Sequence, residues 1–111
     1  MAAIANLRID QGASFSSDVT VTNSAGDVVD LTGYTTEAKM AKSYGADTTV
    51  TITSALASDP TTGVVELTLT DSQTAALDAP ARYVYDVYIT QTSTSTVTRV
   101  IEGVITVNPK V

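Results

Sequence analysis

The sequence contains no cysteine, no histidine and no tryptophan. Without cysteine there is no disulfide, no thiolate nucleophile and no cysteine-ligated zinc. Without histidine the chain lacks the commonest general base, the commonest metal ligand and any Ser-His-Asp triad. A tryptophan platform for stacking a sugar ring is also missing. These absences exclude the commonest catalytic and metal-binding arrangements, so we expect no cofactor, no catalytic residue and no metal ligand among the usual residue types.

Basic residues are scarce as well, with six Lys and Arg against twelve Asp and Glu and a net charge of −6. The bases are scattered along the chain, so no basic patch for nucleic acid or for anionic lipid is expected. No stretch approaches the ~20 apolar residues of a transmembrane helix. Residues 1–6 lack the charged start and apolar run of a signal peptide. We therefore expect a chain that folds in cytoplasm and binds neither nucleic acid nor membrane.

What the sequence does contain is threonine and short segments in which apolar and polar residues alternate. At 111 residues and 43% hydrophobic content, a single domain spanning residues 1–111 is expected. The longest alternating segments are residues 82–90 and 97–107, which predict a β-hairpin joined by an exposed loop. Shorter ones lie at residues 7–10, 15–22, 28–31, 34–40, 49–53 and 65–70. Gly103, inside the second hairpin strand, indicates a bulge or a close approach of another backbone.

Both faces of the predicted hairpin carry apolar residues. One face is expected to line the core and holds Tyr83, Tyr85, Val87, Ile89, Ile101 and Ile105. The opposite face holds Val84, Tyr88, Val100 and Val104. Because an apolar outer face is normally covered by something, these four residues are candidates for contact with another protein or another copy of the chain.

Residues 71–77 are the one helical candidate, with Asp71 or Ser72 as its cap, and Pro80 follows. Seven or eight strands with turn signals every ~8–12 residues and one helical turn are typical of an immunoglobulin-like antiparallel β-sandwich. Tyr83 directly follows the helical turn, which is the position of a tyrosine corner in such domains. The predicted fold is therefore all-β and immunoglobulin-like.

Tyr44 and several carboxylates are the remaining candidate site residues. Tyr44 lies in a polar loop, where either a partner contact or local packing explains it. Asp18, Asp27 and Asp30 could together bind Ca²⁺, although aspartate is common in turns for its own hydrogen bonds. Asp86 and Glu102 could form a hydrolase pair, or a cross-strand salt-bridge network with Arg82 or Arg99.

Five segments in order resemble small immunoglobulin-like virion proteins of tailed bacteriophages, those of marine and cyanobacterial phages in particular. They are residues 10–15, 29–34, 42–44, 74–77 with 82–86, and 98–103 with the valine-rich end. The pattern is also similar to the N-terminal domain of phage baseplate upper proteins. The family usually has glycine where this chain has Ala81.

The resemblance implies a non-enzymatic structural protein of the virion, assembled in the cytoplasm of the bacterial host. Its partners would be capsid, tail or baseplate proteins and other copies of the chain, in a homo-oligomer. A chain of one small domain suits an accessory or decoration protein. The alternative is a host-surface carbohydrate-binding module, in which Tyr44 would contact the sugar.

Overall fold

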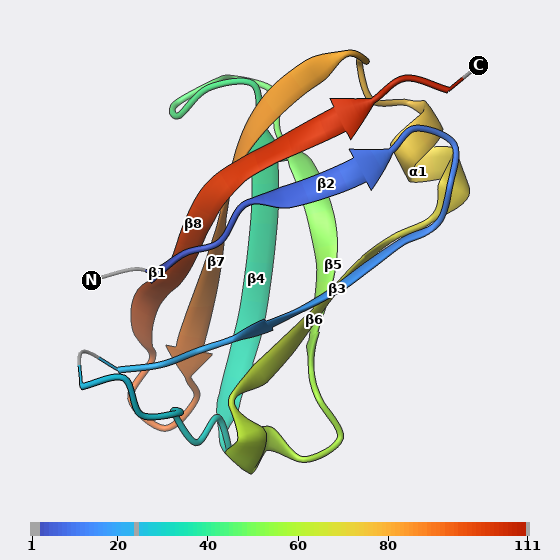
Figure 1. Cartoon of the computed structure of the whole chain (residues 1–111). Coiled ribbons are helices and arrows are strands. Elements are labelled where there is room, and N and C mark those ends of the chain that lie inside the picture. Colours follow the sequence, from blue (N-terminus) through green and yellow to red (C-terminus); the bar gives the residue numbers. More distant parts are fainter. Residues whose placement is uncertain (1–2, 24, 111) are drawn as a thin grey trace.

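The computed structural model describes residues 3–23 and 25–110, and it confirms the all-β prediction (Figure 1). The described residues form eight strands, one α-helical turn and one 3-10 turn. The strands are β1 (Ala3–Ile4), β2 (Leu7–Asp10), β3 (Phe15–Thr20), β4 (Tyr34–Ala41), β5 (Val50–Leu56), β6 (Val64–Leu69), β7 (Ala81–Gln91) and β8 (Thr96–Asn108). The turns are η1 (Pro60–Thr62) and α1 (Asp71–Ala75). Residues 28–31, predicted as a strand, contribute only an isolated bridge between Thr22 and Val28.

The strands follow one continuous path, β1-β8-β7-β4-β5-β6-β3, and β2 also pairs with β8. Strand β5 makes the path bend, because residues 50–52 pair with β4 whereas residues 53–56 pair with β6. The sheet therefore wraps around the core and is nearer to an open barrel than to two separate layers. The predicted antiparallel pairing holds from β3 to β8, whereas β1 and β2 run parallel to β8. Parallel pairing joins the two ends of the chain, and local turn signals carry no information about it.

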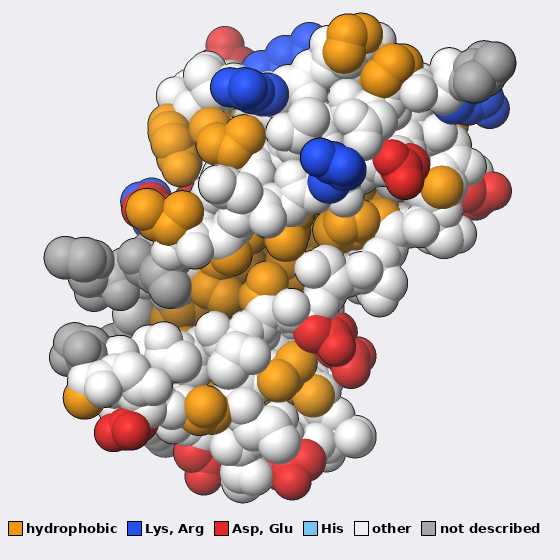
Figure 2. Space-filling view, in the orientation of Figure 1, with side chains coloured by type: hydrophobic (Ala, Val, Ile, Leu, Met, Phe, Trp, Pro, Cys, Tyr) orange, Lys and Arg blue, Asp and Glu red, His pale blue; other side chains and the backbone are white. Residues whose placement is uncertain are grey.

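The seam of this open barrel lies between β2 and β3. Figure 2 shows hydrophobic side chains at the floor of a hollow between β2 and β8 on one side and β3 on the other. No strand pairing joins β2 to β3 among the described residues. Both strands are therefore edges of the sheet, and the core is covered there by side chains alone.

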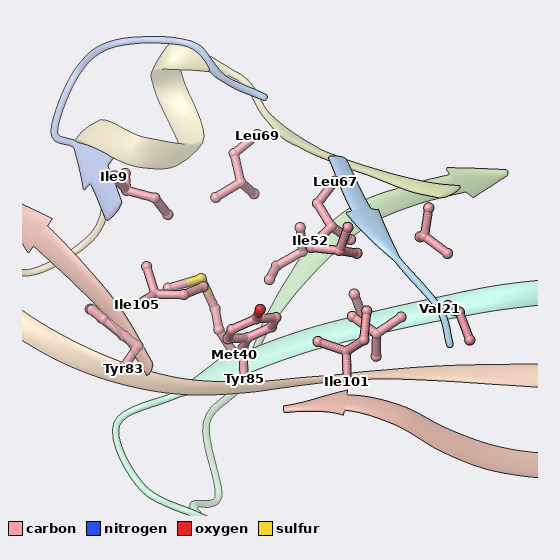
Figure 3. Close-up of a cluster of buried hydrophobic side chains, with 14 of the residues drawn as sticks. Ile9, Val21, Met40, Ile52, Leu67, Leu69, Tyr83, Tyr85, Ile101 and Ile105 are labelled. Carbon is pink, nitrogen blue, oxygen red and sulfur yellow. The ribbon is translucent and has the colours of Figure 1, made fainter. Parts of the chain in front are cut away.

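The predicted β7–β8 hairpin is present and supplies much of the core. Its inward side chains include Tyr85, Val87, Ile101 and Ile105, all 1% exposed or less. They meet buried residues of β2, β4, β5 and β6, as Figure 3 shows for Ile9, Met40, Ile52 and Leu67. Burial of each such side chain contributes about 1.5–3 kcal/mol. The period-two alternation of the sequence therefore identified the core face of the hairpin correctly.

Gly103 permits the close approach that its place in the strand predicted. A Cβ at this position would lie 2.1 Å from the carbonyl oxygen of Ala5 and 2.8 Å from its carbonyl carbon. The Tyr85 hydroxyl donates a hydrogen bond to the same carbonyl, at 2.5 Å. The segment between β1 and β2 is thus held against the inner side of the hairpin.

The helical turn α1 lies inside the predicted region but is capped by Thr70, not by Asp71 or Ser72. Thr70 accepts from the backbone N–H of Gln73, and the Gln73 side chain accepts from the backbone N–H of Thr70, which is a capping box. Thr74 is fully buried; its hydroxyl donates to the Ala13 carbonyl at 2.8 Å and accepts from the Gly12 N–H at 3.1 Å. This side chain ties α1 to the turn between β2 and β3.

Tyr83 is the first buried residue of β7, the strand that follows α1. Its hydroxyl accepts a hydrogen bond from the backbone N–H of Asp78, at 3.0 Å. This is the bond that a tyrosine corner makes to backbone a few residues upstream. It fixes the path of residues 78–83 as the chain turns from α1 into the hairpin.

Candidate functional site

The outward side chains of β7 and β8, with their neighbours on β4, form a surface that we call the hairpin face. Strand register sets its rows. Val84 lies between Ala41 and Val104, and Asp86 lies between Lys39 and Glu102. The third row places Tyr88 between Glu37 and Arg99. Val84, Tyr88 and Val104, all predicted to face outward, do so and are half-buried.

The prediction for Val100 is wrong. A register shift between Val87 and Tyr88 pairs Val87 with Ile101 but Tyr88 with Arg99, so Val100 is the extra residue of a β-bulge. Val100 packs against the core instead of joining the hairpin face. The bulge reverses the alternation of β8 before Val100. Arg99 therefore points outward, whereas uninterrupted alternation would place it on the inward side with Ile101.

Arg99 organises the charges of the hairpin face. Its guanidinium lies 2.5 Å from a Glu102 carboxylate oxygen and 4.0 Å from one of Asp86. The two acids are directly opposite each other in the β7–β8 ladder. One guanidinium therefore bridges a pair of adjacent carboxylates and offsets one of their two negative charges. This is the salt-bridge alternative that the sequence left open for Asp86 and Glu102.

Tyr44 extends over the same face from the loop between β4 and β5. Its side chain is 58% exposed, and the Arg99 guanidinium carbon lies 5.8 Å from the centre of its ring. This distance is within the range of a cation–π interaction. The contact between Tyr44 and Arg99 was not predicted, because it joins a loop and a bulged strand position that are far apart in sequence.

A depression of about 280 Å³ lies between this loop and the hairpin face. Its lining includes Tyr44, Val84, Asp86 and Tyr88, together with Glu37 and Lys39 of β4. The depression combines two phenol rings with two carboxylates and an amine. Such a set of groups can contact a polar ligand or receive a projecting side chain of another protein.

A second depression, of about 420 Å³, lies on the other side of the loop, next to the end of α1. Lys42 and Asp78 line it and form an ion pair. The hydrogen bond to Asp78 raises the pKa of Lys42 above its ordinary value. This pair fixes the loop to the segment after α1 and so helps to place Tyr44.

The aspartates proposed for Ca²⁺ are dispersed. Asp18, Asp27 and Asp30 are all exposed, and no group of three or more potential metal ligands is found among the described residues. Asp30 accepts hydrogen bonds from both the hydroxyl and the backbone N–H of Thr32, which lower its pKa. Its geometry is that of a turn-forming aspartate.

Comparison of the chain with protein-family models and with curated protein sequences found no match. In the part of the chain that the structure describes, no helix is long and apolar enough to span a membrane.

Proposed function

We propose that this chain is a non-enzymatic structural protein of a tailed-bacteriophage virion. It decorates the capsid or forms part of the tail or baseplate, through contacts with other virion proteins and with copies of itself. The single observation that carries the proposal is the hairpin face, where Val84, Tyr88 and Val104 remain half-exposed around a charge network. Apolar side chains gathered on the outer side of a sheet are typical of a surface that another protein covers.

The resemblance to small virion proteins supports the biological setting of the proposal. The architecture suits it as well, because two strands of 11 and 13 residues form a long hairpin held by a shared core. A rigid surface loses little conformational entropy when it binds, which favours repeated use in an assembly. Assembly would take place in the cytoplasm of the bacterial host.

The test is the mass of the purified protein in solution, measured by light scattering over a range of concentrations. The double variant Val84→Thr/Val104→Thr keeps the β-branched shape but replaces a methyl group with a hydroxyl at both outward positions. We expect it to weaken self-association about ten-fold or more, because buried apolar contacts are lost. Electron microscopy of the concentrated wild-type protein should show regular oligomers.

Val97→Thr is the matched control. Val97 is 62% exposed near the tip of the hairpin and lies away from the rows of the hairpin face, so its replacement should leave association unchanged. Equal association of the wild type and the Val84→Thr/Val104→Thr variant would contradict the proposal that this face is the contact surface.

A second candidate function, recognition of a host-surface carbohydrate, is favoured by the depression beside Tyr44. Its phenol rings and carboxylates offer stacking and hydrogen bonding to a sugar. Screening on a glycan array should then give a ligand whose binding falls at least ten-fold on Tyr44→Ala, as expected for the loss of a central aromatic contact. Unchanged binding by Tyr44→Ala would exclude this site.

A further inference from the structure

The charges of this protein are divided between two parts of the fold. Residues 9–38 and 43–81 contain no Lys or Arg. These two segments include β3, β5 and β6, whereas β2, β4, β7 and β8 carry Arg8, Lys39, Arg82 and Arg99. Figure 2 shows the same division on one side of the molecule, with basic side chains near β2 and β8 and only acidic charges on the β3 side of the hollow.

Two arginines mark one end of the hairpin face. Arg8 of β2 and Arg82 of β7 are both paired with Thr106 of β8, one from each side, so the three residues form a row. Both arginines are exposed, and neither forms an ion pair with any described residue. The next row of the same face contains Val84 and Val104. The result is an apolar patch bordered by two unpaired cations.

The outward side of β3 and β6, which we call the acidic face, has the complementary charge. Asp18 and Glu66 are directly opposite each other in this antiparallel pair, and both are exposed. Two carboxylates in this arrangement repel each other. No base lies within 4.0 Å of either one among the described residues.

The acidic face and the hairpin face point in opposite directions. Val19 and Leu67 of β3 and β6 lie in the same buried cluster as Tyr85 and Ile105 of β7 and β8. Because the inward sides of both strand pairs meet in one core, their outward sides face away from each other. No single copy can therefore bring its own arginines to Asp18 and Glu66.

We propose that the arginine end of the hairpin face docks on the acidic face of a second copy of this chain. Arg8 and Arg82 of one copy pair with Asp18 and Glu66 of the next, and Val84 and Val104 are covered by the contact. Arginine forms two parallel hydrogen bonds with a carboxylate, so two arginines satisfy two carboxylates. The inference deepens the proposed virion role and rests on it.

A two-fold symmetric dimer through the arginine end is disfavoured, because it would bring Arg8 and Arg82 of one copy against the same residues of the other. Like charges placed together at an interface cost several kcal/mol. Docking of one face on a different face is heterologous and leads to closed rings or to filaments. The charge division thus selects head-to-tail assembly over a symmetric dimer.

The experiment measures self-association by sedimentation velocity in ~20 mM salt, where charge pairs are weakly screened. Wild-type protein should associate. Arg8→Glu/Arg82→Glu should weaken association by about 100-fold or more, and Asp18→Lys/Glu66→Lys should do the same. An equal mixture of the two variants should associate again, because the unchanged acidic face of the first meets the unchanged arginines of the second.

Asp27→Lys/Asp47→Lys is the matched control for Asp18→Lys/Glu66→Lys. It makes the same change in net charge, at exposed positions outside the two faces. It should associate like the wild type. Arg8→Gln/Arg82→Gln is a milder second variant should charge reversal impair folding, and it should also weaken association.

Two results would overturn the inference. The first is a wild-type protein that stays monomeric up to ~1 mM in low salt, where charge attraction is strongest. The second is an Asp18→Lys/Glu66→Lys variant that associates as strongly as the wild type. If the latter occurs while Val84→Thr/Val104→Thr still weakens association, the hairpin face remains the contact surface. The head-to-tail geometry alone then fails, so the failure of this inference is distinguishable from the failure of the proposed function.

Discussion

Two pairs of acidic residues occupy equivalent positions in two parts of this molecule. Asp86 and Glu102 face each other across β7 and β8, and Asp18 and Glu66 face each other across β3 and β6. The first pair shares the guanidinium of Arg99, whereas the second has no base within 4.0 Å in the described chain. The same local pattern therefore stabilises one strand pair and opposes the other.

A single β-bulge creates this difference. Because Val100 is the extra residue in β8, Arg99 reaches the outward side and lies between the two acids of the hairpin face. In β3 and β6 no base is available, since the segments that contain them lack Lys and Arg altogether. The hairpin thus places a base between its two opposed acids, whereas Asp18 and Glu66 have no base within 4.0 Å among the described residues. In the proposed assembly a second copy would supply that base.

The largest expected effect concerns two glycines against which other residues pack closely, Gly103 in β8 and Gly63 just before β6. Gly103→Ala should destabilise the protein by about 3 kcal/mol, because its Cβ would lie 2.1 Å from the Ala5 carbonyl oxygen and backbone must move. Gly63→Ala should cost about 2 kcal/mol, since this residue has φ of 70° and its Cβ would lie 2.5 Å from the Val28 side chain. Urea denaturation of both variants measures these losses. A smaller loss for Gly103→Ala than for Gly63→Ala would contradict the expectation that the contact with the Ala5 backbone is the harder of the two to relieve.

The next effect concerns α1, the helical turn that connects β6 to β7. Thr74→Val should lower the free energy of unfolding by about 2 kcal/mol, because the part-buried hydrogen bonds of the Thr74 hydroxyl to the Gly12 N–H and the Ala13 carbonyl are lost. Urea denaturation is again the measurement. Ser72→Ala, at an exposed position of the same turn, should change stability by less than about 0.5 kcal/mol. Equal effects of the two substitutions would show that the Thr74 hydroxyl does not stabilise the contact between α1 and the turn that follows β2.

A pH-dependent effect is expected in the hairpin half. Burial raises the pKa of Tyr85 to about 12, whereas an unfolded tyrosine titrates near ~10. Because the folded state holds this proton more tightly, the stability from Tyr85 is fully present below about pH 10 and is lost as the pH rises toward about 12. Urea midpoints across this window should fall for the wild type and fall less for Tyr85→Phe.

Tyr44→Phe is the control for this pH profile, since the Tyr44 side chain is 58% exposed. It should leave the decline above pH ~10 unchanged. A Tyr85→Phe profile identical to that of the wild type would contradict the assignment of the decline to Tyr85.

The smallest effect is the most specific to the comparison of the two acid pairs. Asp86→Asn should destabilise the protein, because Arg99 loses one of its two acids, whereas Asp18→Asn should stabilise it by relieving repulsion from Glu66. Each change is expected to be about 0.5 kcal/mol and to shrink at high salt. Thermal unfolding of both variants in low and high salt measures the signs. The same sign for both would mean that Arg99 makes no difference between the pairs.

Alternation in the sequence predicted the hairpin, the inward positions of its core residues and the outward positions of Val84, Tyr88 and Val104. It could not predict the bulge at Val100, because no glycine or asparagine marks that position. The bulge in turn hid the contact between Arg99 and Tyr44. The parallel pairing of β1 and β2 with β8 depends on contacts between the two ends of the chain, which no local pattern encodes.

In the proposed assembly Asp18 and Glu66 repel each other within one copy and attract the arginines of the next copy. The most direct test is Asp18→Asn/Glu66→Gln, measured for both thermal stability and self-association in low salt. We expect a higher melting temperature together with weaker association, because repulsion within the strand pair and attraction to a second copy are removed at once. A fall in both stability and association, or unchanged association, would show that Asp18 and Glu66 do not have these two opposite effects.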